Sequence, residues 1–280
     1  MCGIIAAAST RNVGKLLVQG LHKMEYRGYD SAGIALHQNS SIAHHRTVGK
    51  VQLLEDRMIA EKPKSKLGIA HTRWATHGEP SEANAHPHKS KEAVYIVHNG
   101  IIENYVELRE SLINDGYDFT SQTDSELIAH MLDYFIKQDN SMIEAMYLAK
   151  EKLDGAYAIA AIDLRNNSNV VVARNKSPLL LGLGADEMFA ASDPIAIAQH
   201  TNDFIFLEDG DVASISAEEY KIYDASKLEV SREITHIDIS NQATSKGEFR
   251  HHMEKEIYEQ PEAVLNTIDC LLYTSDAADD

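Results

Sequence analysis

The sequence predicts an α+β fold built on antiparallel sheets. Strand-like stretches follow one another with only short turns between them, and amphipathic helices are gathered in one block, over residues 103–115, 124–138 and 142–153. The regular alternation of strand and helix that produces a parallel sheet is missing. A doubly wound fold is therefore disfavoured.

The first elements are read from the apolar pattern. An apolar run over residues 3–8 predicts a buried strand that starts almost at the first residue. Apolar residues at helical spacing over 13–24 predict an amphipathic helix that ends near Gly28. Two strands joined by a short turn are then expected over 31–37 and 42–48.

The remaining elements are mostly strands. A strand over 67–72 is followed by an alternating stretch, 93–98, that runs into Asn99-Gly100, a dipeptide typical of a hairpin turn. The Asn-rich segment 166–169 predicts a second turn, between the first two strands of the second half. The strands expected in the second half cover residues 156–164, 170–174, 179–183, 188–191, 204–207, 212–215 and 220–223. Beyond them, residues 250–269 have a helical pattern.

Composition and charge exclude several classes of protein. The 280 residues are 44% hydrophobic and 25% charged, as in globular proteins, and no apolar run is long enough to span a bilayer. The net charge is −17, with +5 on residues 1–100 and −22 on the rest, which argues against nucleic-acid binding. Two cysteines, Cys2 and Cys270, are expected to be reduced thiols in a cytoplasmic protein.

Cys2 is the first candidate for chemistry. If Met1 is removed, Cys2 carries both a thiol and a free α-amine with a pKa near ~8, so one residue holds a nucleophile and a general base. By position alone, a small buried residue at the start of a strand is the favoured explanation of Cys2. The neighbouring sequence blocks favour the catalytic interpretation.

Four blocks in order, residues 1–5, 25–33, 71–78 and 98–104, closely resemble the glutaminase domain of the glutamine:fructose-6-phosphate aminotransferases (isomerizing), or glucosamine-6-phosphate synthases. This family lies within the class II glutamine amidotransferases, which are N-terminal nucleophile hydrolases. The resemblance extends over residues 1 to about 268. It implies a four-layer αββα sandwich of antiparallel sheets.

The resemblance also implies a role for each of five residues. Cys2 matches the nucleophile that forms a glutamyl thioester. Asn99 and Gly100 match the oxyanion hole, through a side-chain amide and a backbone N–H. Arg73 matches the residue that holds the glutamine α-carboxylate, and Asp124 the acid that meets the α-ammonium.

Each of these roles has a structural alternative. Asn99-Gly100 by itself predicts only a turn, and Arg73 could be a surface residue at a strand end. Residues 123–126, Thr-Asp-Ser-Glu, fit a capping box, which would explain Asp124 without any ligand. The capping role and the binding role of Asp124 are compatible.

The block that contains Arg73 supplies further candidates for the substrate pocket. Trp74 is the single tryptophan and resembles the gate that shields released ammonia, although a lone tryptophan is more often core or interface. Thr76, His77 and Gly78 would line the same pocket.

The histidines raise the possibility of a metal. His71, His77, His86, His88 and His98 fall within 28 residues, and His86-Pro87-His88 could offer two imidazoles. No third-ligand pattern accompanies them, and the family uses no metal in this domain. We therefore expect neither a metal nor a cofactor.

The predicted domains are a glutaminase domain at 1–234, a linker at 235–247, the start of a missing sugar-isomerase domain at 248–268 and a non-family tail at 269–280. The expected function is hydrolysis of L-glutamine to glutamate and ammonia, the ammonia-supplying half of glucosamine 6-phosphate synthesis. Fructose 6-phosphate would bind only through the missing domain. Full-length relatives are expected to be homo-oligomeric, with no nucleic acid or membrane as partner.

Two other functions stay open. The chain could be a non-catalytic, truncated fragment that binds glutamine without turning it over. It could also be another class II amidotransferase, which donates ammonia to a ribosyl or aspartyl acceptor. The block from Tyr26 to Gly33 argues against this last possibility.

Overall fold

The computed structural model describes residues 2–75, 78–238, 249, 253–255, 257–261 and 264. The chain divides into two units, Met1–Asp238 and Ile239–Asp280. In the second unit, the described residues from 253 onward are helical, in agreement with the helical pattern of the sequence there. Cys270 and the predicted tail at 269–280 lie outside the described residues.

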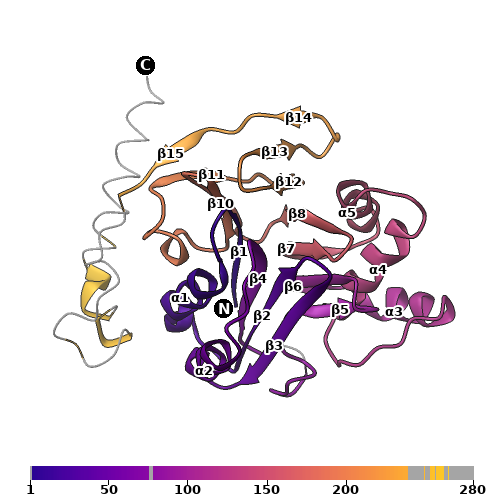
Figure 1. Cartoon of the computed structure of the whole chain (residues 1–280), viewed down its shortest axis with the longest axis horizontal. Helices are drawn as coiled ribbons and strands as arrows, with labels where there is room; N and C mark the ends of the chain where they lie inside the picture. Colours follow the sequence, from indigo (N-terminus) through magenta and orange to yellow (C-terminus); the bar gives the residue numbers. More distant parts are fainter. Residues whose placement is uncertain are drawn as a thin grey trace. The chain divides into compact units, whose positions relative to one another are not determined.

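The first unit contains two antiparallel sheets (Figure 1). The larger has eight strands in the order β15-β11-β9-β10-β1-β4-β2-β3. Its strands are β1 (Gly3–Ser9), β2 (Ser31–Gln38), β3 (Ser41–Val48), β4 (Leu67–Arg73), β9 (Leu180–Gly184), β10 (Glu187–Ala191), β11 (Asp203–Phe206) and β15 (Ile234–His236). In this sheet β1 lies between β4 and β10.

The second sheet has seven strands in the order β14-β13-β12-β8-β7-β6-β5. Its strands are β5 (His88–Ser90), β6 (Val94–Ile102), β7 (Gly155–Asp163), β8 (Asn166–Asn175), β12 (Val212–Ile215), β13 (Tyr220–Tyr223) and β14 (Glu229–Val230). The long pairing of β6 with β7 covers all nine residues of β6.

The two sheets pack through alternate residues of their strands. Ile4 and Ala6 of β1 belong to the same core cluster as Tyr95 and Val97 of β6. Successive side chains of a strand point to opposite faces, so Ile5, which is also fully buried, faces away from the second sheet. The eight-stranded sheet is therefore buried on both faces along β1.

Helices form the two outer layers. The helices are α1 (Gly14–Met24), α2 (Val51–Glu61), α3 (Tyr105–Asn114), α4 (Glu126–Ile136) and α5 (Met142–Lys150), with short 3-10 turns η1 (Glu25–Arg27) and η2 (Pro194–Ala196). The first two cover the outer face of the eight-stranded sheet, and α4 and α5 cover the outer face of the other (Figure 1). The predicted four-layer αββα sandwich is confirmed.

The turn predicted at Asn99-Gly100 is wrong, because β6 continues through both residues. Asn99 pairs with Ala158 and Gly100 with Tyr157 of β7. Gly100 has φ +133°, and a Cβ there would lie 1.9 Å from the Ala156 carbonyl oxygen. Only glycine fits this strand position without strain. The pairing with β7 overrides the local preference of Asn-Gly for a turn.

The second predicted turn, at residues 166–169, is also wrong. These residues begin β8, and the hairpin turns over the two residues between Asp163 and Asn166. The Asp163 carboxylate accepts from the backbone N–H and the Nε–H of Arg165, at 3.1 and 2.8 Å. Because the Asp163 carboxylate binds two N–H groups of Arg165, it stabilises this two-residue turn.

Two segments differ from their expected structure. Helix α2 was not expected, because its buried stripe is narrow and consists of Val51, Leu54 and Met58. β15 pairs with β11, so the first two residues of the predicted linker, Thr235 and His236, belong to the sheet. The domain boundaries themselves stay predictions.

Candidate functional site

One end of the gap between the sheets gathers polar side chains. In three chain segments, the alternation that turns apolar residues toward the space between the sheets continues to a polar residue. These residues are Cys2 before β1, His71 in β4 and Asn99 in β6. The strand register then places Cys2 next to the end of β4, because Gly3 pairs with Thr72.

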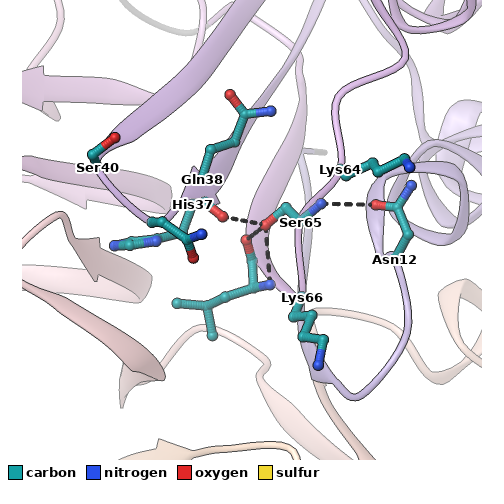
Figure 2. Close-up of a pocket in the computed structure, with 9 residues that line it drawn as sticks. Asn12, His37, Gln38, Ser40, Lys64, Ser65 and Lys66 are labelled. Carbon is teal, nitrogen blue, oxygen red and sulfur yellow. Dashed lines mark hydrogen bonds between the residues drawn. The ribbon is translucent and has the colours of Figure 1, made fainter.

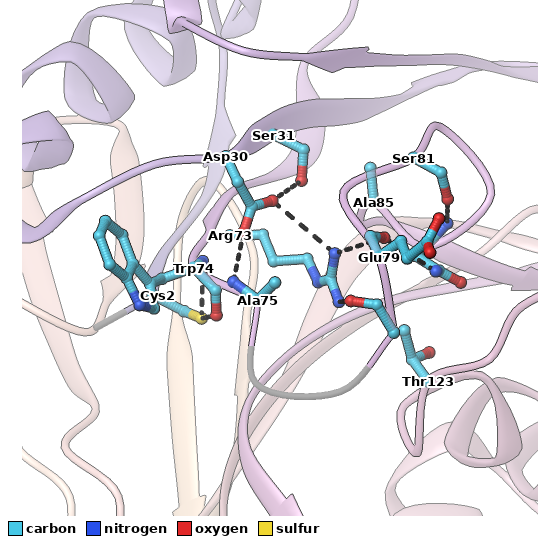
Figure 3. A network of polar contacts seen from close by, with 12 residues as sticks. Cys2, Asp30, Ser31, Arg73, Trp74, Ala75, Glu79, Ser81, Ala85 and Thr123 are labelled. Atoms are coloured by element: carbon cyan, nitrogen blue, oxygen red, sulfur yellow. Dashed lines mark hydrogen bonds and ion pairs between the residues drawn. The ribbon is translucent and has the colours of Figure 1, made fainter.

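Cys2 is held by the chain that follows β4 (Figure 3). Its Sγ accepts a hydrogen bond from the Trp74 N–H at 3.3 Å and lies 3.5 Å from the Trp74 carbonyl oxygen. Burial raises the pKa of the Cys2 thiol, while the Trp74 N–H and the Arg73 charge oppose this increase. A thiol with a raised pKa needs a base before it can act as a nucleophile.

Arg73 is buried at the end of β4, so the alternative of a surface arginine is wrong. Its side chain is 4% exposed, and its Nη1 lies 3.7 Å from Asp30 Oδ1. The guanidinium also donates to the carbonyl oxygens of Gly78 and Glu79, at 3.3 and 3.5 Å (Figure 3). These partners fix a planar fork of donors beside Cys2, which suits a carboxylate ligand.

Trp74 is half exposed, at 52%, so it is not a core residue. Its ring lies against Gly28, where a Cβ would fall 2.1 Å from the ring atom Cε3. Gly28 has φ +101°, so the backbone there also favours glycine. The indole thus covers the residues just before β2, next to the Cys2 thiol.

Asn99 connects Cys2 to the second sheet. Its Nδ2 donates to the Cys2 carbonyl oxygen at 3.3 Å, and its Oδ1 lies 2.9 Å from His71 Nε2. Gly100, the other predicted oxyanion residue, follows it in β6 and is exposed. The side-chain amide predicted to bind the oxyanion therefore lies beside Cys2.

Asp124 is buried, and its role in the fold differs from the expected capping box. Its Oδ2 accepts the Ile102 N–H at the end of β6, at 2.8 Å, and its Oδ1 accepts the Ser125 hydroxyl at 3.2 Å. Helix α4 begins at Glu126, and its N-cap residue Ser125 makes no side-chain capping bond. The Glu126 carboxylate instead accepts the N–H groups of residues 120 and 121.

Three predicted pocket residues remain to be placed. Thr76 and His77 lie outside the described residues. Gly78 is described, and its carbonyl oxygen accepts from Arg73 at 3.3 Å. It therefore belongs to the immediate surroundings of the guanidinium.

Three of the clustered histidines form a buried row, and His71 at one end of it contacts Asn99. The rings of His71 and His86 lie 4.2 Å apart, and those of His86 and His88 4.5 Å apart. Burial lowers the pKa of all three, and of His98. Within the described part of the chain, no group of three or more His, Cys, Asp or Glu side chains is arranged to hold a metal ion.

A separate hollow lies at the opposite end of β4 (Figure 2). Its volume is about 640 Å³, and it is lined by polar residues around Ser65, with Lys64 and Lys66 beside it. Leu67 lines it and Arg73 ends the same strand, so roughly 20 Å separates the hollow from the candidate site. None of the predicted site residues that are described lines it.

Sequence reasoning missed two residues of the site. Asp30 pairs with Arg73 and accepts the Ala75 N–H, and His71 contacts Asn99. Both lie in the blocks that carry the family resemblance, but neither has a distinctive spacing. Only the three-dimensional contacts assign them to the site.

Comparisons with known proteins agree with this geometry. Residues 71–199 match the glutamine amidotransferase domain family. The chain is 48% identical over 270 residues to glutamine--fructose-6-phosphate aminotransferase (isomerizing) of Vibrio parahaemolyticus, and 49% identical over 271 residues to that of Haemophilus influenzae. Each match covers 96% of this chain and 44% of the relative, so the chain spans less than half of their length.

Solved structures show the same fold. The glutamine phosphoribosylpyrophosphate amidotransferase of B. subtilis matches with a TM-score of 0.70 and 24% identity, over 81% of this chain and 50% of that one. A glutamine aminotransferase class-II domain protein from Silicibacter pomeroyi matches with a TM-score of 0.55 and 14% identity, over 80% of this chain and 99% of that one. At these identities the likeness concerns the fold alone.

The fold and the sequence together define a class II glutamine amidotransferase domain with the N-terminal nucleophile hydrolase architecture. Within that class, the chain belongs to the family of the glutamine--fructose-6-phosphate aminotransferases (isomerizing). The family resemblance predicted from the four sequence blocks is confirmed.

Proposed function

We propose that the chain hydrolyses L-glutamine to glutamate and ammonia through a glutamyl thioester on Cys2. The observation that carries the proposal is the meeting of the Cys2 thiol, the Asn99 amide and the buried Arg73 guanidinium at one end of the two sheets. Amide hydrolysis needs a nucleophile and oxyanion donors, and glutamine recognition needs a partner for its α-carboxylate. These three residues supply one of each.

The first chemical step uses both groups of Cys2. After Met1 is removed, the free α-amine takes the thiol proton while Sγ attacks the γ-carbonyl carbon of glutamine. The amine then gives this proton to the departing ammonia, and the C–N bond breaks to leave the thioester. In the second half, the amine activates water, which cleaves the thioester and releases glutamate.

The oxyanion that forms in both halves needs donors. We assign this role to the Asn99 Nδ2 and the Gly100 backbone N–H, both within β6. The amide nitrogen lies 3.3 Å from the Cys2 carbonyl oxygen, and its second N–H can donate to the oxyanion of the substrate. Removal of one such donor typically lowers kcat by about 10²- to 10³-fold.

The remaining predicted residues recognise and enclose the substrate. Arg73 binds the α-carboxylate and Asp124 the α-ammonium. Trp74 covers the pocket and retains ammonia. We propose that Thr76, His77 and Gly78 line the same pocket.

Ammonia produced here would be used to make glucosamine 6-phosphate from fructose 6-phosphate, the acceptor in the names of the relatives. The acceptor would bind to the part of the relatives that this chain does not span. We propose that the full-length enzyme is a homo-oligomer. We also propose a cytoplasmic location, because the catalytic thiol must stay reduced. No described helix is long and apolar enough to cross a membrane.

The test is glutaminase activity of the full chain with Met1 removed, measured with and without fructose 6-phosphate. We expect glutamate release that disappears in Cys2→Ala and in preparations that retain Met1. The second cysteine of the chain, Cys270, supplies the matched control, Cys270→Ala, which should keep its activity. Activity in Cys2→Ala would refute the proposed nucleophile.

A covalent probe separates the catalytic function from mere binding. A glutamine analogue with an electrophilic ketone should add one molecule per chain, at Cys2, as measured by intact mass. Glutamine binding without any adduct or turnover would support the alternative of a non-catalytic fragment. Turnover stimulated by fructose 6-phosphate would show that this chain binds the acceptor by itself.

A further inference from the structure

His71 touches the side chain that the proposed function assigns to the oxyanion. It lies in β4 with no exposed surface, and its Nε2 is 2.9 Å from Asn99 Oδ1. The contact joins the two sheets, because β4 and β6 belong to different ones. The contact is therefore buried between two strands of the sandwich.

The chemistry of the two atoms defines the direction of this hydrogen bond. An amide oxygen only accepts, so Nε2 must carry a proton and donate. Burial lowers the pKa of His71 to about 3, and the nearby Arg73 charge acts in the same direction. At neutral pH the ring is therefore uncharged, with its single proton on Nε2.

Together with the Cys2 carbonyl oxygen, this hydrogen bond determines which end of the Asn99 amide faces Cys2. With Oδ1 held by His71, the Nδ2 group points to the Cys2 carbonyl oxygen, 3.3 Å away. A rotated amide would place its NH2 against the His71 N–H and its oxygen against the Cys2 carbonyl. The contact between the two oxygens is repulsive whichever ring nitrogen of His71 carries the proton, so the Cys2 carbonyl oxygen selects the observed orientation and the Nε2–H of His71 then holds it.

We infer that His71 is a positioning residue that holds the Asn99 amide with its NH2 on the side of Cys2, where the reacting carbonyl of the substrate would bind. The inference rests on the proposed glutaminase function, since it gives Asn99 a fixed donor before substrate arrives. Preorganised donors stabilise a transition state without paying for reorientation during the reaction. In this arrangement His71 acts through Asn99, because its Nε2 is engaged by the Asn99 Oδ1.

The first experiment compares two variants of the Met1-processed full chain. His71→Gln can retain an N–H near the Nε2 position, whereas His71→Leu removes it. We expect His71→Leu to lower kcat by roughly 10- to 100-fold with KM nearly unchanged, and His71→Gln to recover most of this loss. Equal kcat for the two variants would overturn the inference.

A double-mutant cycle separates positioning from general packing. In an Asn99→Ala chain, His71→Leu should lower kcat by less than 3-fold, taking ~3-fold as the limit of ordinary non-additivity between neighbours. The control is His130→Leu, another buried histidine, which contacts Tyr117 and Phe119 away from Cys2. This control should keep the wild-type kcat, and a full His71→Leu effect without Asn99 would contradict the proposal.

A spectroscopic measurement tests the inference independently of turnover. Nitrogen-15 spectra of histidine-labelled protein, with His71→Gln to assign the signal, show which ring nitrogen carries the proton. We expect the proton on Nε2 throughout pH 6 to 8, because this range lies well above the His71 pKa of about 3 and the ring therefore stays uncharged. A proton on Nδ1 alone would overturn the inference, even if the chain proves inactive and the proposed function fails.

Discussion

The Asp30 carboxylate lies 3.7 Å from the Arg73 guanidinium and also accepts the N–H of Ala75, two residues further along. Asp30 precedes β2, while Arg73 ends β4, and these strands pair directly. The pair therefore ties the two strand ends together at the edge of the candidate site. It also holds the guanidinium at a fixed place beside Cys2.

The first prediction concerns this ion pair. Asp30→Asn should lower the free energy of unfolding by about 1–3 kcal/mol, because a buried guanidinium loses a charged acceptor. It should also raise KM for glutamine, since Arg73 loses its support. The measurements are urea denaturation and glutaminase kinetics.

An exposed ion pair provides the matched control. Glu82 lies 2.9 Å from Arg57, with both side chains about half exposed. Glu82→Gln should cost less than about 1 kcal/mol and leave KM unchanged. Equal effects of the two substitutions would show that the Asp30 pair has no special role.

The second prediction concerns the strained glycine of β6. Gly100→Ala should destabilise the protein by at least about 1–3 kcal/mol, because φ is +133° and the new Cβ meets the Ala156 carbonyl oxygen. Gly116→Ala is the control: φ is +83°, but nothing lies within 4 Å of its Cβ. Denaturation midpoints should show a clearly smaller loss for Gly116→Ala, and equal losses would refute the clash.

Local pattern predicted most of the fold, and long-range pairing explains the main misses. The strand and helix over residues 3–24 agree with β1 and α1 to within a few residues, since their apolar periodicity is strong. The turn predicted at Asn99-Gly100 does not form, because β7 pairs along the whole of β6. No local signal reveals such a partner, which lies more than fifty residues away in sequence.

The same limit applies to the site. Cys2 and Arg73 were identified through the family resemblance, and the structure places them beside one another. His71 and Asp30 act through contacts between strands, so their residue type alone does not distinguish them from other buried polar residues. The resemblance supplies the residues predicted to react, and the fold adds the residues that contact them.

The third prediction tests the oxyanion donor. Asn99→Ala should lower kcat by about 10²- to 10³-fold, with a much smaller change in KM. Asn104→Ala is a suitable control, because the Asn104 amide donates to the Lys152 carbonyl oxygen and accepts the Asp154 N–H. These two hydrogen bonds connect the start of α3 to the chain that follows α5. The control should lose stability and keep kcat, whereas a similar kcat loss in both would contradict the assignment.

The fourth prediction concerns pH. Burial raises the pKa of the Cys2 thiol, so the thiolate fraction is small at neutral pH and increases as pH rises toward that pKa. In protein that retains Met1, so that no α-amine lies on Cys2 itself, alkylation of Cys2 by iodoacetamide should therefore have its midpoint at a higher pH than alkylation of a short cysteine peptide. Peptide mass spectrometry across pH 6 to 10 measures it, and a midpoint below that of the peptide would contradict the effect of burial.

The last prediction uses Trp74 as a reporter. It is the only tryptophan of the chain, so intrinsic tryptophan fluorescence comes entirely from beside Cys2. Its side chain is 52% exposed, and a ligand held by Arg73 would cover part of it. In Cys2→Ala, which prevents turnover, glutamine should reduce quenching by acrylamide.

The comparison with a simpler amide decides whether Arg73 is responsible. Propionamide carries the same reacting group as glutamine but lacks the α-carboxylate, so it should give no protection at the same concentration. Arg73→Lys keeps the charge but loses the planar fork, and it should require more glutamine for the same protection. Equal protection by both amides would mean that the guanidinium does not select the substrate.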